Sequence, residues 1–525
     1  MTAIIRAMDP IELSIFSSRI AAVCDEMGAT LQRSALSPNI KDRLDFSCAV
    51  FDNNGDLCAQ AAHIPVHLGS MAYAMAEIIA RIQWSPGDMV IVNDPFLGGT
   101  HLPDVTLIAP LFMDGELVVF VANRAHHADI GASTPGSMPV SRHIEEEGLV
   151  IPPTLVVRGG VLDSECFNGI INATRNPHGS YGDLSAQISA NRCGLDRLEV
   201  LVAAMGLSSF RDYLTALNDY GERLALSALR AIPNGNYRFC DYLDDDGAGT
   251  LDLPLQVSIE VRDGKIHADF TGSADQSPGN VNCPLSVAAA GVYYVFRCLM
   301  PPQTPACAGS LRAIRLTVPP GSLLNARYPA AVAAGNVETS TRVVDVVMGA
   351  LAGALPERIP AASHGSMNNV AMGGRVDHGH WDYYETIGGG MGAGANGGGL
   401  SAVQTHMTNT RNTPIEGIEM YYPLRIRRYG VWEGSGGKGR RAGGDGIIRE
   451  YEFLAETSVT LLTERRRHAP WGLNGGRSGH AGENMYNDHP LPGKVAFVAR
   501  PGDRLVIKTP GGGGWGKDQE ATEHF

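Results

Sequence analysis

Apolar residues recur every three or four positions between Ile11 and Ser34, the spacing that places them on one face of a helix. Asp9 and Pro10 stand immediately before this stretch, where an N-cap residue and a first-turn proline are favoured. The sequence therefore predicts a long amphipathic helix near the start of the chain.

Two apolar runs at 105–112 and 116–123 predict a β-hairpin, because Asp114 and Gly115 between them form a strong two-residue turn signal. With the turn at these two residues, Asp104 is expected to lie opposite Ala125. Opposed residues on antiparallel strands are about 4.5–5.5 Å apart. The pattern therefore brings His101, Asp104 and His126 to one end of a single ladder.

A second hairpin is predicted from the runs at 46–51 and 57–62, which flank a turn at 53–56. Its open end gathers two carboxylates and two imidazoles, namely Asp42, Asp45, His63 and His67. At the first hairpin the polar residues are equally compatible with solvated or capping side chains, since His-x-x-Asp is a weak motif by itself. At the second, Asp45 as a cap and His63 and His67, each taken alone, as core or turn residues are the favoured interpretation.

The remaining periodicity predicts helices and short strands in alternation. Helices are expected at 68–83, at 184–231 in pieces broken near Gly194 and Gly206, at 285–299, and from about Gly335 onward; 176–183 is expected to be a turn. Strands are expected at 89–93, 257–262 and 266–270. The predicted fold is α+β, mixed and Gly-rich, with β-hairpins carrying a metal site and with interspersed helices. From Asn236 onward short β runs with turns replace the helical pattern, which predicts two regions, 1–235 and 236–525.

The composition is typical of a globular protein with 525 residues, 44% of them hydrophobic and 18% charged. A formal net charge of −13 argues against a nucleic-acid-binding protein, which needs a basic face. The nine cysteines are dispersed without a Cys-x-x-Cys pair, as in proteins of reducing compartments. No signal sequence and no apolar run of roughly 18 residues is recognised. We therefore expect a cytoplasmic protein.

Glycine is the compositional outlier, with 63 residues, and eight of the twelve residues at 388–399 are Gly. Such a run predicts a loop against which a ligand or another backbone packs closely. It lacks the strand and helix context of a dinucleotide fingerprint, so a structural or mobile loop is at least as well supported as a phosphate cradle. The following segment, 404–416, is unusually dense in hydrogen-bonding side chains.

A nucleotide site is not convincingly encoded in this chain. The segment from Asp94 through Gly98, Gly99 and Thr100 is similar to the phosphate loop of actin-like ATPases, but two extra residues and a proline intervene. A Walker-type Gly-x-x-x-x-Gly-Lys-Ser/Thr motif is absent from the sequence.

Several long motifs, taken together, are far more specific than any one of them. The chain resembles the B subunits of the hydantoinase/oxoprolinase family throughout its length, in the stretches 33–47, 93–104, 125–131, 335–340, 404–416, 434–439 and 443–446. The resemblance implies an ATP-dependent cyclic amide hydrolase acting on hydantoin, 5-oxoproline or a related lactam. In this family an A subunit of actin-like ATPase fold phosphorylates the carbonyl, and the B subunit completes ring opening at a divalent metal. ATP would thus be bound by a partner subunit, in a heterotetramer.

The resemblance assigns the metal ligands to Asp42, His101, Asp104 and His126. Many family members have Glu at position 42, so Asp42 offers an arm shorter by one methylene. Two imidazoles and two carboxylates suit Zn²⁺, Mn²⁺ or Fe²⁺. A metal ion of this kind lowers the pKa of bound water to roughly 7 and would supply the nucleophile. His127, or Asp129, is expected to move the proton or to orient His126.

Two other functions remain open at this point. The chain could be a subunit of an acetone- or acetophenone-type ATP-dependent carboxylase, although the carboxylase subunits of the family tend to be longer. Alternatively, it could be a scaffold that only shapes its partner, with a structural polar cluster.

Overall fold

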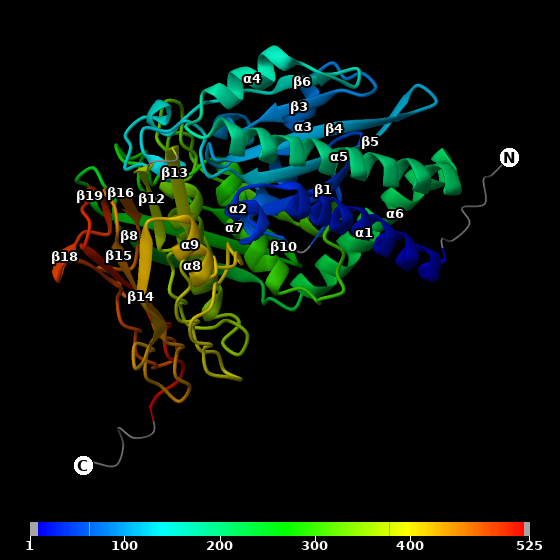
Figure 1. The fold of residues 1–525 in the computed structure, drawn as a ribbon. Coiled ribbons are helices and arrows are strands. Elements are labelled where there is room, and N and C mark those ends of the chain that lie inside the picture. Colours follow the sequence, from blue (N-terminus) through cyan, green and yellow to red (C-terminus); the bar gives the residue numbers. More distant parts are fainter. Residues whose placement is uncertain (1–8, 62, 377–378, 519–525) are drawn as a thin grey trace.

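The computed structural model describes residues 9–61, 63–376 and 379–518. Helices and largely antiparallel sheets alternate along the chain (Figure 1), which confirms the predicted α+β class. The α-helices are α1 (Pro10–Ser34), α2 (Pro38–Lys41), α3 (Pro65–Ala80), α4 (Ser164–Asn172), α5 (Pro177–Met205), α6 (Leu207–Leu229), α7 (Leu285–Cys298), α8 (Ser340–Ala352) and α9 (Ile415–Tyr421). Shorter helical turns are η1 (Pro95–Leu97), η2 (Pro135–Ser137), η3 (Ile144–Glu146), η4 (Ala308–Leu311) and the π-helical η5 (Gly335–Thr339).

A seven-stranded antiparallel sheet forms the centre of the first part of the chain. Its order is β2-β1-β5-β4-β3-β6-β7. Both predicted hairpins belong to it and lie side by side, because β1 pairs with β5. The bounds are β1 (Phe46–Asp52), β2 (Leu57–Gln60), β3 (Met89–Val92), β4 (Asp104–Met113), β5 (Glu116–His126), β6 (Thr154–Arg158) and β7 (Val161–Leu162).

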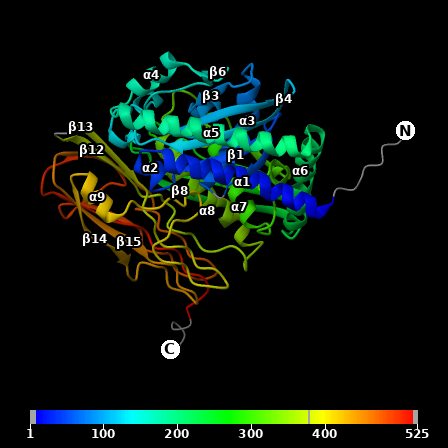
Figure 2. The same cartoon turned by 45° about the vertical axis from the view of Figure 1, so that its right-hand side comes forward.

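Helices cover both faces of this sheet, which explains why its strands are continuous apolar runs rather than alternating ones. Successive side chains on a strand point to opposite faces. On β5, Val119 and Val121 pack in one cluster with α1 and α5, whereas Phe120 and Ala122 pack in another with α3. In both ribbon views α1 and α5 run side by side along one face (Figure 2).

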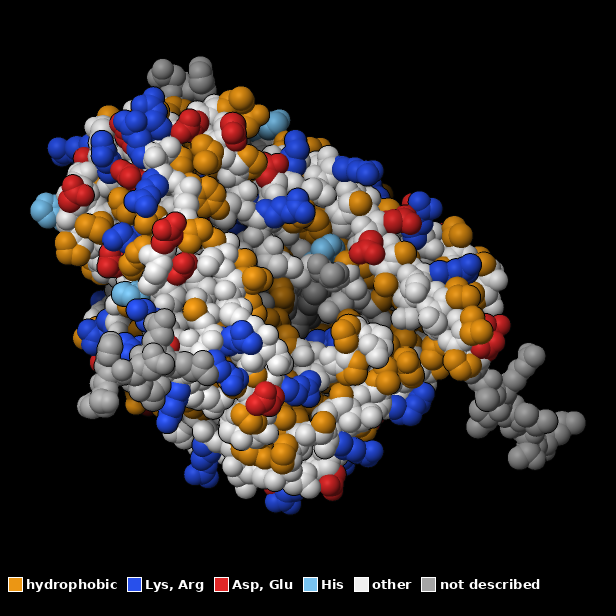
Figure 3. Space-filling view, turned by 90° about the horizontal axis from the view of Figure 1, so that it is seen from below, with side chains coloured by type: hydrophobic (Ala, Val, Ile, Leu, Met, Phe, Trp, Pro, Cys, Tyr) orange, Lys and Arg blue, Asp and Glu red, His pale blue; other side chains and the backbone are white. Residues whose placement is uncertain are grey.

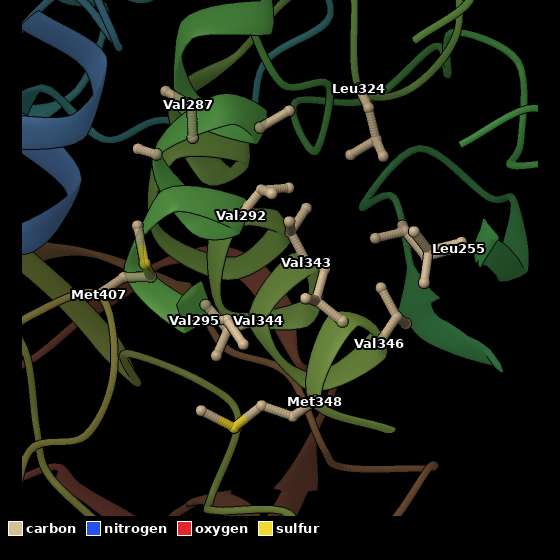
Figure 4. Close-up of a cluster of buried hydrophobic side chains, with 14 of the residues drawn as sticks. Leu255, Val287, Val292, Val295, Leu324, Val343, Val344, Val346, Met348 and Met407 are labelled. Atoms are coloured by element: carbon tan, nitrogen blue, oxygen red, sulfur yellow. The ribbon is translucent and has the colours of Figure 1, made fainter. Parts of the chain in front are cut away.

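The second part of the chain contains two packed helices and three further sheets. Valines of α7 and α8 interdigitate with one another and with β9 (Figure 4). The strands in sheet order are β11 (Ile314–Thr317), β10 (Lys265–Asp269), β9 (Leu251–Arg262) and β8 (Gly235–Asp245). They are followed by β13 (Gly379–Glu385), β12 (Asn369–Val376), β16 (Thr457–Leu462) and β19 (Lys494–Ala499) in one sheet. The last sheet holds β14 (Leu424–Trp432), β15 (Gly446–Phe453), β20 (Arg504–Lys508), β17 (Glu483–Tyr486) and β18 (His489–Leu491).

The two parts meet where α3 crosses α7. A Cβ atom on Gly69 of α3 would lie 2.7 Å from Cα of Ala290 on α7, so only glycine permits this approach. Seen from below, the molecule is hollowed near its middle, and hydrophobic and basic side chains surround the hollow (Figure 3). The four sheets divide at about residue 235, but the expected domain boundary there stays a prediction.

Glycine-rich segments stack against one another outside the named strands and form what we call the glycine bundle, residues 388–399, 434–445, 472–479 and 510–516. Their backbones are joined by hydrogen bonds, for example from Gly444 N to Met391 O and from Gly512 N to Gly444 O, both at 2.9 Å. A Cβ on Gly390 would lie 1.9 Å from Gly444 O. The sequence left open whether a ligand or another backbone packs against the glycine run. The structure shows that another backbone does.

Two local expectations are wrong for identifiable reasons. The predicted turn at 176–183 is the start of α5, because Asn176 caps it and Pro177 occupies its first position. Helix α5 also continues through Gly194, where a Cβ would lie 2.5 Å from the sulfur of Met27. This glycine serves close packing on α1; the break at Gly206 is confirmed. Helices α4 and α9 were not predicted.

Among the described residues, no single helix is both long and apolar enough to span a membrane. One sharply bent pair, α5 with α6, passes that test by length and composition alone.

Candidate metal centre

The loop before β4 is shaped by its own side chains and by two glycines. The carboxylate of Asp94 accepts a hydrogen bond from Phe96 N at 2.9 Å and starts η1. Gly98 ends this turn with φ +98°, and a Cβ on Gly99 would lie 2.3 Å from Asn93 O. The chain therefore folds back tightly and delivers His101 to the start of β4.

Three ligand atoms lie together at the ends of β4 and β5. His101 Nε2, Asp104 Oδ1 and His126 Nδ1 are each 3.2 Å from the other two. All three side chains are buried. His101 Nδ1 lies 3.4 Å from the carbonyl oxygen of Ala333, an acceptor that favours a proton on Nδ1 and a free lone pair on Nε2.

This arrangement fits a divalent metal ion. Bonds of about 2.0–2.1 Å in tetrahedral geometry place ligand atoms about 3.3 Å apart, close to the spacing seen here. Hydrogen bonds among themselves cannot satisfy two imidazole nitrogens and a carboxylate oxygen that all lie at hydrogen-bond distance from one another. The other ring nitrogen of His126, Nε2, is buried and has no hydrogen-bond partner in the part of the chain that the structure describes. The three residues form the only group of this kind among the residues that the structure describes.

Further polar groups on the α3 face of the sheet surround the three ligands. His67, in the first turn of α3, places Nε2 at 3.1 Å from Asp104 Oδ2 and 4.0 Å from Asp45 Oδ1. Thr100 donates a hydrogen bond of 2.5 Å to Asp104 Oδ2. The second carboxylate, Asp45, precedes β1 and is only 6% exposed.

The second part of the chain closes the site from the other side. Asn336, in the π-helical turn η5, places Nδ2 at 3.2 Å from His101 Nε2, and its Oδ1 is buried with no partner within residues 9–61, 63–376 and 379–518. π-Helical turns are often found at functional sites. Tyr384 of β13 stacks on His126 with ring centroids 4.6 Å apart. Its hydroxyl donates to Asn369 Oδ1 at 2.7 Å.

The charges in the cluster stabilise one another. Burial opposes ionisation of Asp104, but His101 and His67 outweigh it and hold the pKa of this carboxyl well below its usual range. Burial also opposes the charged form of His101, yet the Asp104 carboxylate raises the pKa of that imidazole. For His126 burial prevails and lowers the pKa. Asp104 is thus held as a carboxylate and His126 is favoured as a neutral imidazole, which are the forms that bind metal, whereas a metal ion would have to displace a proton that the Asp104 carboxylate stabilises on His101.

The expected register of the hairpin is wrong by one residue. The turn at Asp114 and Gly115 is confirmed, with φ of +52° and +80°. However, a β-bulge between Leu111 and Phe112 shifts the pairing, so that Asp104 lies opposite His126 rather than Ala125. The bulge therefore brings two of the candidate ligands, Asp104 and His126, into direct opposition.

Two of the expected site residues lie outside the cluster. Asp42 is exposed at the end of α2, and the buried acid near the ligands is Asp45 instead. His127 directly follows the last residue of β5 and lies on the opposite face from His126, where its Nε2 is 2.9 Å from Gln187 Oε1 on α5. Asp129 is also engaged elsewhere, since it accepts hydrogen bonds from Gly131 N and Arg175 N.

Sequence reasoning singles out His67 and Asp45 only as members of a second hairpin end, and it misses Asn336 and Tyr384. The parity of residues along the strands could have placed Asp45 with His126. For Asn336 the available signal is the motif at 335–340, which the periodicity marks only as a helix start.

A family model described as hydantoinase B/oxoprolinase matches residues 9–518. The chain belongs to the hydantoinase B/oxoprolinase family. An uncharacterized protein of Methanocaldococcus jannaschii is 41% identical over 98% of this chain and 92% of its own length. The 5-oxoprolinase 1 of Arabidopsis thaliana is 40% identical over 97% of this chain, which spans only 42% of that relative. A protein of a Pseudomonas species, named as the B subunit of a D-/L-hydantoinase, is 31% identical over 98% of this chain and 91% of its own length.

Two solved structures share the fold of this family member. The ATP-dependent caprolactamase from Pseudomonas jessenii has a TM-score of 0.90 and 27% identity, covering 98% of this chain and 93% of that one. A nucleotide-free acetone carboxylase has a TM-score of 0.88 and covers 98% of this chain and 77% of that one. At 19% identity, the second likeness shows the fold alone.

Proposed function

We propose that this chain is the B subunit of an ATP-dependent cyclic amide hydrolase and that it opens a carbonyl-phosphorylated ring at a divalent metal. The observation that carries the proposal is the triangle of His101, Asp104 and His126 ligand atoms. The names of the relatives, which include a 5-oxoprolinase, a hydantoinase and a caprolactamase, support a hydrolase of cyclic amides.

The ATP-binding part is proposed to lie on a partner, an A subunit of actin-like ATPase fold in a heterotetramer. The chain spans 42% of the Arabidopsis 5-oxoprolinase but 91% of the Pseudomonas hydantoinase relative, which is named as one subunit. The activity of the longer relative would thus be divided between two chains here. The absence of a Walker motif from the sequence agrees with this division.

The proposed ligands are His101, Asp104 and His126, and Asp45 replaces Asp42 as the nearest further carboxylate. The ion could be Zn²⁺, Mn²⁺ or Fe²⁺, since imidazole and carboxylate ligands suit all three. When bound, it would acidify water and polarise the carbonyl.

The chain's own residues prepare the site for ring opening. His67 and Thr100 fix the orientation of Asp104 through its outer oxygen. The Asn336 amide offers an uncharged N–H beside the ligands, suited to the negative charge that develops on oxygen during attack. Burial of the whole cluster excludes bulk water and strengthens these interactions. Attack by water on the phosphorylated carbon forms a C–O bond, the C–N bond then breaks, and the ring nitrogen takes a proton and leaves as an amine. The acyl phosphate that remains is hydrolysed by a second water to a carboxylate and inorganic phosphate.

The proposal is tested by elemental analysis of the wild type and of the variants His101→Ala, Asp104→Ala and His126→Ala. We expect about one metal ion per wild-type chain and loss of it in each folded variant. His127→Ala is the matched control, because it removes the buried imidazole next to His126 in the sequence without touching the cluster. Asp42→Ala and Asp45→Ala distinguish the two carboxylates, and only the second should weaken metal binding.

Activity completes the test. ATP-dependent hydrolysis of a cyclic amide should require both the partner subunit and the metal-loaded chain. A wild-type chain that stays metal-free after chelator-free purification and reconstitution would refute the metal mechanism. Full activity of His101→Ala would support a scaffold instead, and ATP-dependent uptake of labelled bicarbonate would support a carboxylase.

A further inference from the structure

The α3 face of the seven-stranded sheet carries a buried cation directly beside the metal centre. Arg124 is only 1% exposed. It stands two residues before His126 on β5, so both side chains point to the same face of the sheet. In the ladder Arg124 pairs with Thr106, and His126 pairs with Asp104 in the next row of that face. An arginine stays charged in a protein, and a buried charge is costly unless its donors are satisfied.

The guanidinium of Arg124 donates hydrogen bonds to three different elements. Nε donates to Thr106 Oγ1 on β4 at 2.7 Å, and Nη1 donates to Ser70 Oγ on α3 at 2.7 Å. Nη2 donates to the carbonyl oxygen of Gly98, in the loop before β4, at 3.1 Å. All three acceptors are uncharged. Because the guanidinium is a rigid planar fork, it fixes the three acceptors relative to one another.

Each of these acceptors lies close in sequence to a side chain of the metal centre. Ser70 follows His67 by one helical turn and donates to its carbonyl oxygen at 3.0 Å. Thr106 follows Asp104 by two residues on β4 and shares its face. The third acceptor ends η1 with a φ of +98°, three residues before His101. The guanidinium therefore joins the elements that carry these three residues to the strand that carries the second histidine ligand.

Packing of α3 on the sheet does not by itself require a cation at this position. Phe120 and Ala122 precede Arg124 on the same face of β5, and both pack with α3 in an apolar cluster. The apolar pattern of this face is broken at the row next to the candidate ligands. The guanidinium thus stands where the loop, β4 and α3 meet around the site.

We propose that Arg124 is a positioning residue, which holds the loop, β4 and α3 in the arrangement that brings His67, His101, Asp104 and His126 together. This inference rests on the proposed function for the identity of the metal ligands. It adds that their geometry depends on the three hydrogen bonds of the guanidinium, and not only on its charge or its volume.

The affinity of the full chain for Zn²⁺, measured by chelator competition, tests the inference. Arg124→Lys keeps the charge but lacks the planar fork, and it should weaken Zn²⁺ binding about tenfold. Thr106→Val removes one acceptor at nearly equal size and should weaken binding about threefold. The double variant should bind no more weakly than Arg124→Lys alone, because both changes break the same hydrogen bond. Arg465→Lys, at a buried arginine that bonds Asp241 and Asp345 instead, is the matched control and should stay within twofold of the wild type.

Three results of this measurement overturn the inference. If Arg124→Lys binds Zn²⁺ as the wild type does, the charge alone is sufficient. If the losses in Arg124→Lys and Thr106→Val add in the double variant, the two residues act independently. If Arg124→Lys does not fold, Thr106→Val decides the matter, and an unchanged affinity in that variant overturns the inference while a threefold loss supports it.

The ring signals of the histidines provide a second measurement that does not need a metal ion. In chelator-treated protein labelled with ¹⁵N-histidine, the signals of His67, His101 and His126 are assigned from their loss in single His→Gln variants. Arg124→Lys should displace or split these signals, and Arg465→Lys should leave them in place. A wild-type chain that binds no metal would refute the metal mechanism, yet displaced ring signals would still support this inference. Ring signals that Arg124→Lys leaves unchanged overturn it, whatever the metal content.

Discussion

Replacing Gly390 by alanine tests whether the glycine bundle depends on bare backbone. The new Cβ would lie 1.9 Å from Gly444 O and 2.3 Å from Gly512 N. Both contacts are to backbone atoms, which cannot rotate aside as the end of a side chain can. To reach ordinary contact distances, the segments would have to separate by more than about 1 Å.

The expected cost follows from what that separation breaks. Overpacking of a close-packed interior costs about 1–3 kcal/mol. Two hydrogen bonds between the same segments, Gly444 N to Met391 O and Gly512 N to Gly444 O, would lengthen, at about 1 kcal/mol each. The free energy of unfolding should thus fall by about 3–5 kcal/mol. For a chain of 525 residues that unfolds as one unit, this lowers Tm by about 3–5 °C.

Differential scanning calorimetry measures the effect, and Gly397→Ala is the matched control from the same glycine run. Gly397 is exposed, and a Cβ there would meet nothing within 4 Å. Its replacement should leave Tm unchanged or slightly raised, because alanine restricts the unfolded chain. Equal Tm values for Gly390→Ala and Gly397→Ala would refute the reasoning.

Three further predictions concern pH, the metal centre and helix packing. Burial raises the pKa of Asp382 to about 6, so the folded state binds the proton of this carboxyl more tightly than the unfolded chain does. The free energy of unfolding should therefore fall by up to about 3 kcal/mol as pH rises from 4 to 6. Asp382→Asn should remove that fall, so its Tm advantage over the wild type should grow across this range and then level off; a constant difference from pH 4 to 8 would contradict the assignment. Tyr384→Leu removes the ring stacked on His126 and should weaken metal affinity about tenfold in a chelator competition, whereas Tyr384→Phe keeps the ring and should bind as the wild type does; equal loss in both would assign the effect to the hydroxyl. Gly69→Ala should lower Tm, because the new Cβ would meet Ala290 Cα on α7. Gly194→Ala should leave Tm nearly unchanged, because the Met27 thioether can move aside and alanine favours helix. A larger loss of Tm in Gly194→Ala than in Gly69→Ala would show that α3 and α7 can shift apart.

The local elements of the site could be predicted from the sequence, whereas its exact pairing could not. The Asp114-Gly115 turn and the two hairpins follow from turn chemistry and apolar runs. The bulge that sets Asp104 against His126 has no comparable signal, because Leu111 and Phe112 are ordinary strand residues. Alternation along a strand would have been enough to exclude His127, which must face away if His126 faces the metal.

The residues that the second part of the chain contributes to the site could not be predicted from local sequence patterns. Arg43 donates a hydrogen bond to the carbonyl oxygen of Tyr384, which is 341 residues away, and no periodicity links such positions. The glycine run is a related case. Its composition indicated close packing, but only the structure identifies the neighbouring backbone.

The assembly of one site from distant segments has a consequence during protein synthesis. His101, Asp104 and His126 leave the ribosome well before Asn336, which is followed by Tyr384. At about 5–20 residues per second, the 210 residues between His126 and Asn336 take about 10–40 s to translate. During that interval the nascent chain carries the three candidate ligands without the groups that later enclose them. Ions in the surrounding solution therefore have access to the incomplete site before the second part of the chain encloses it.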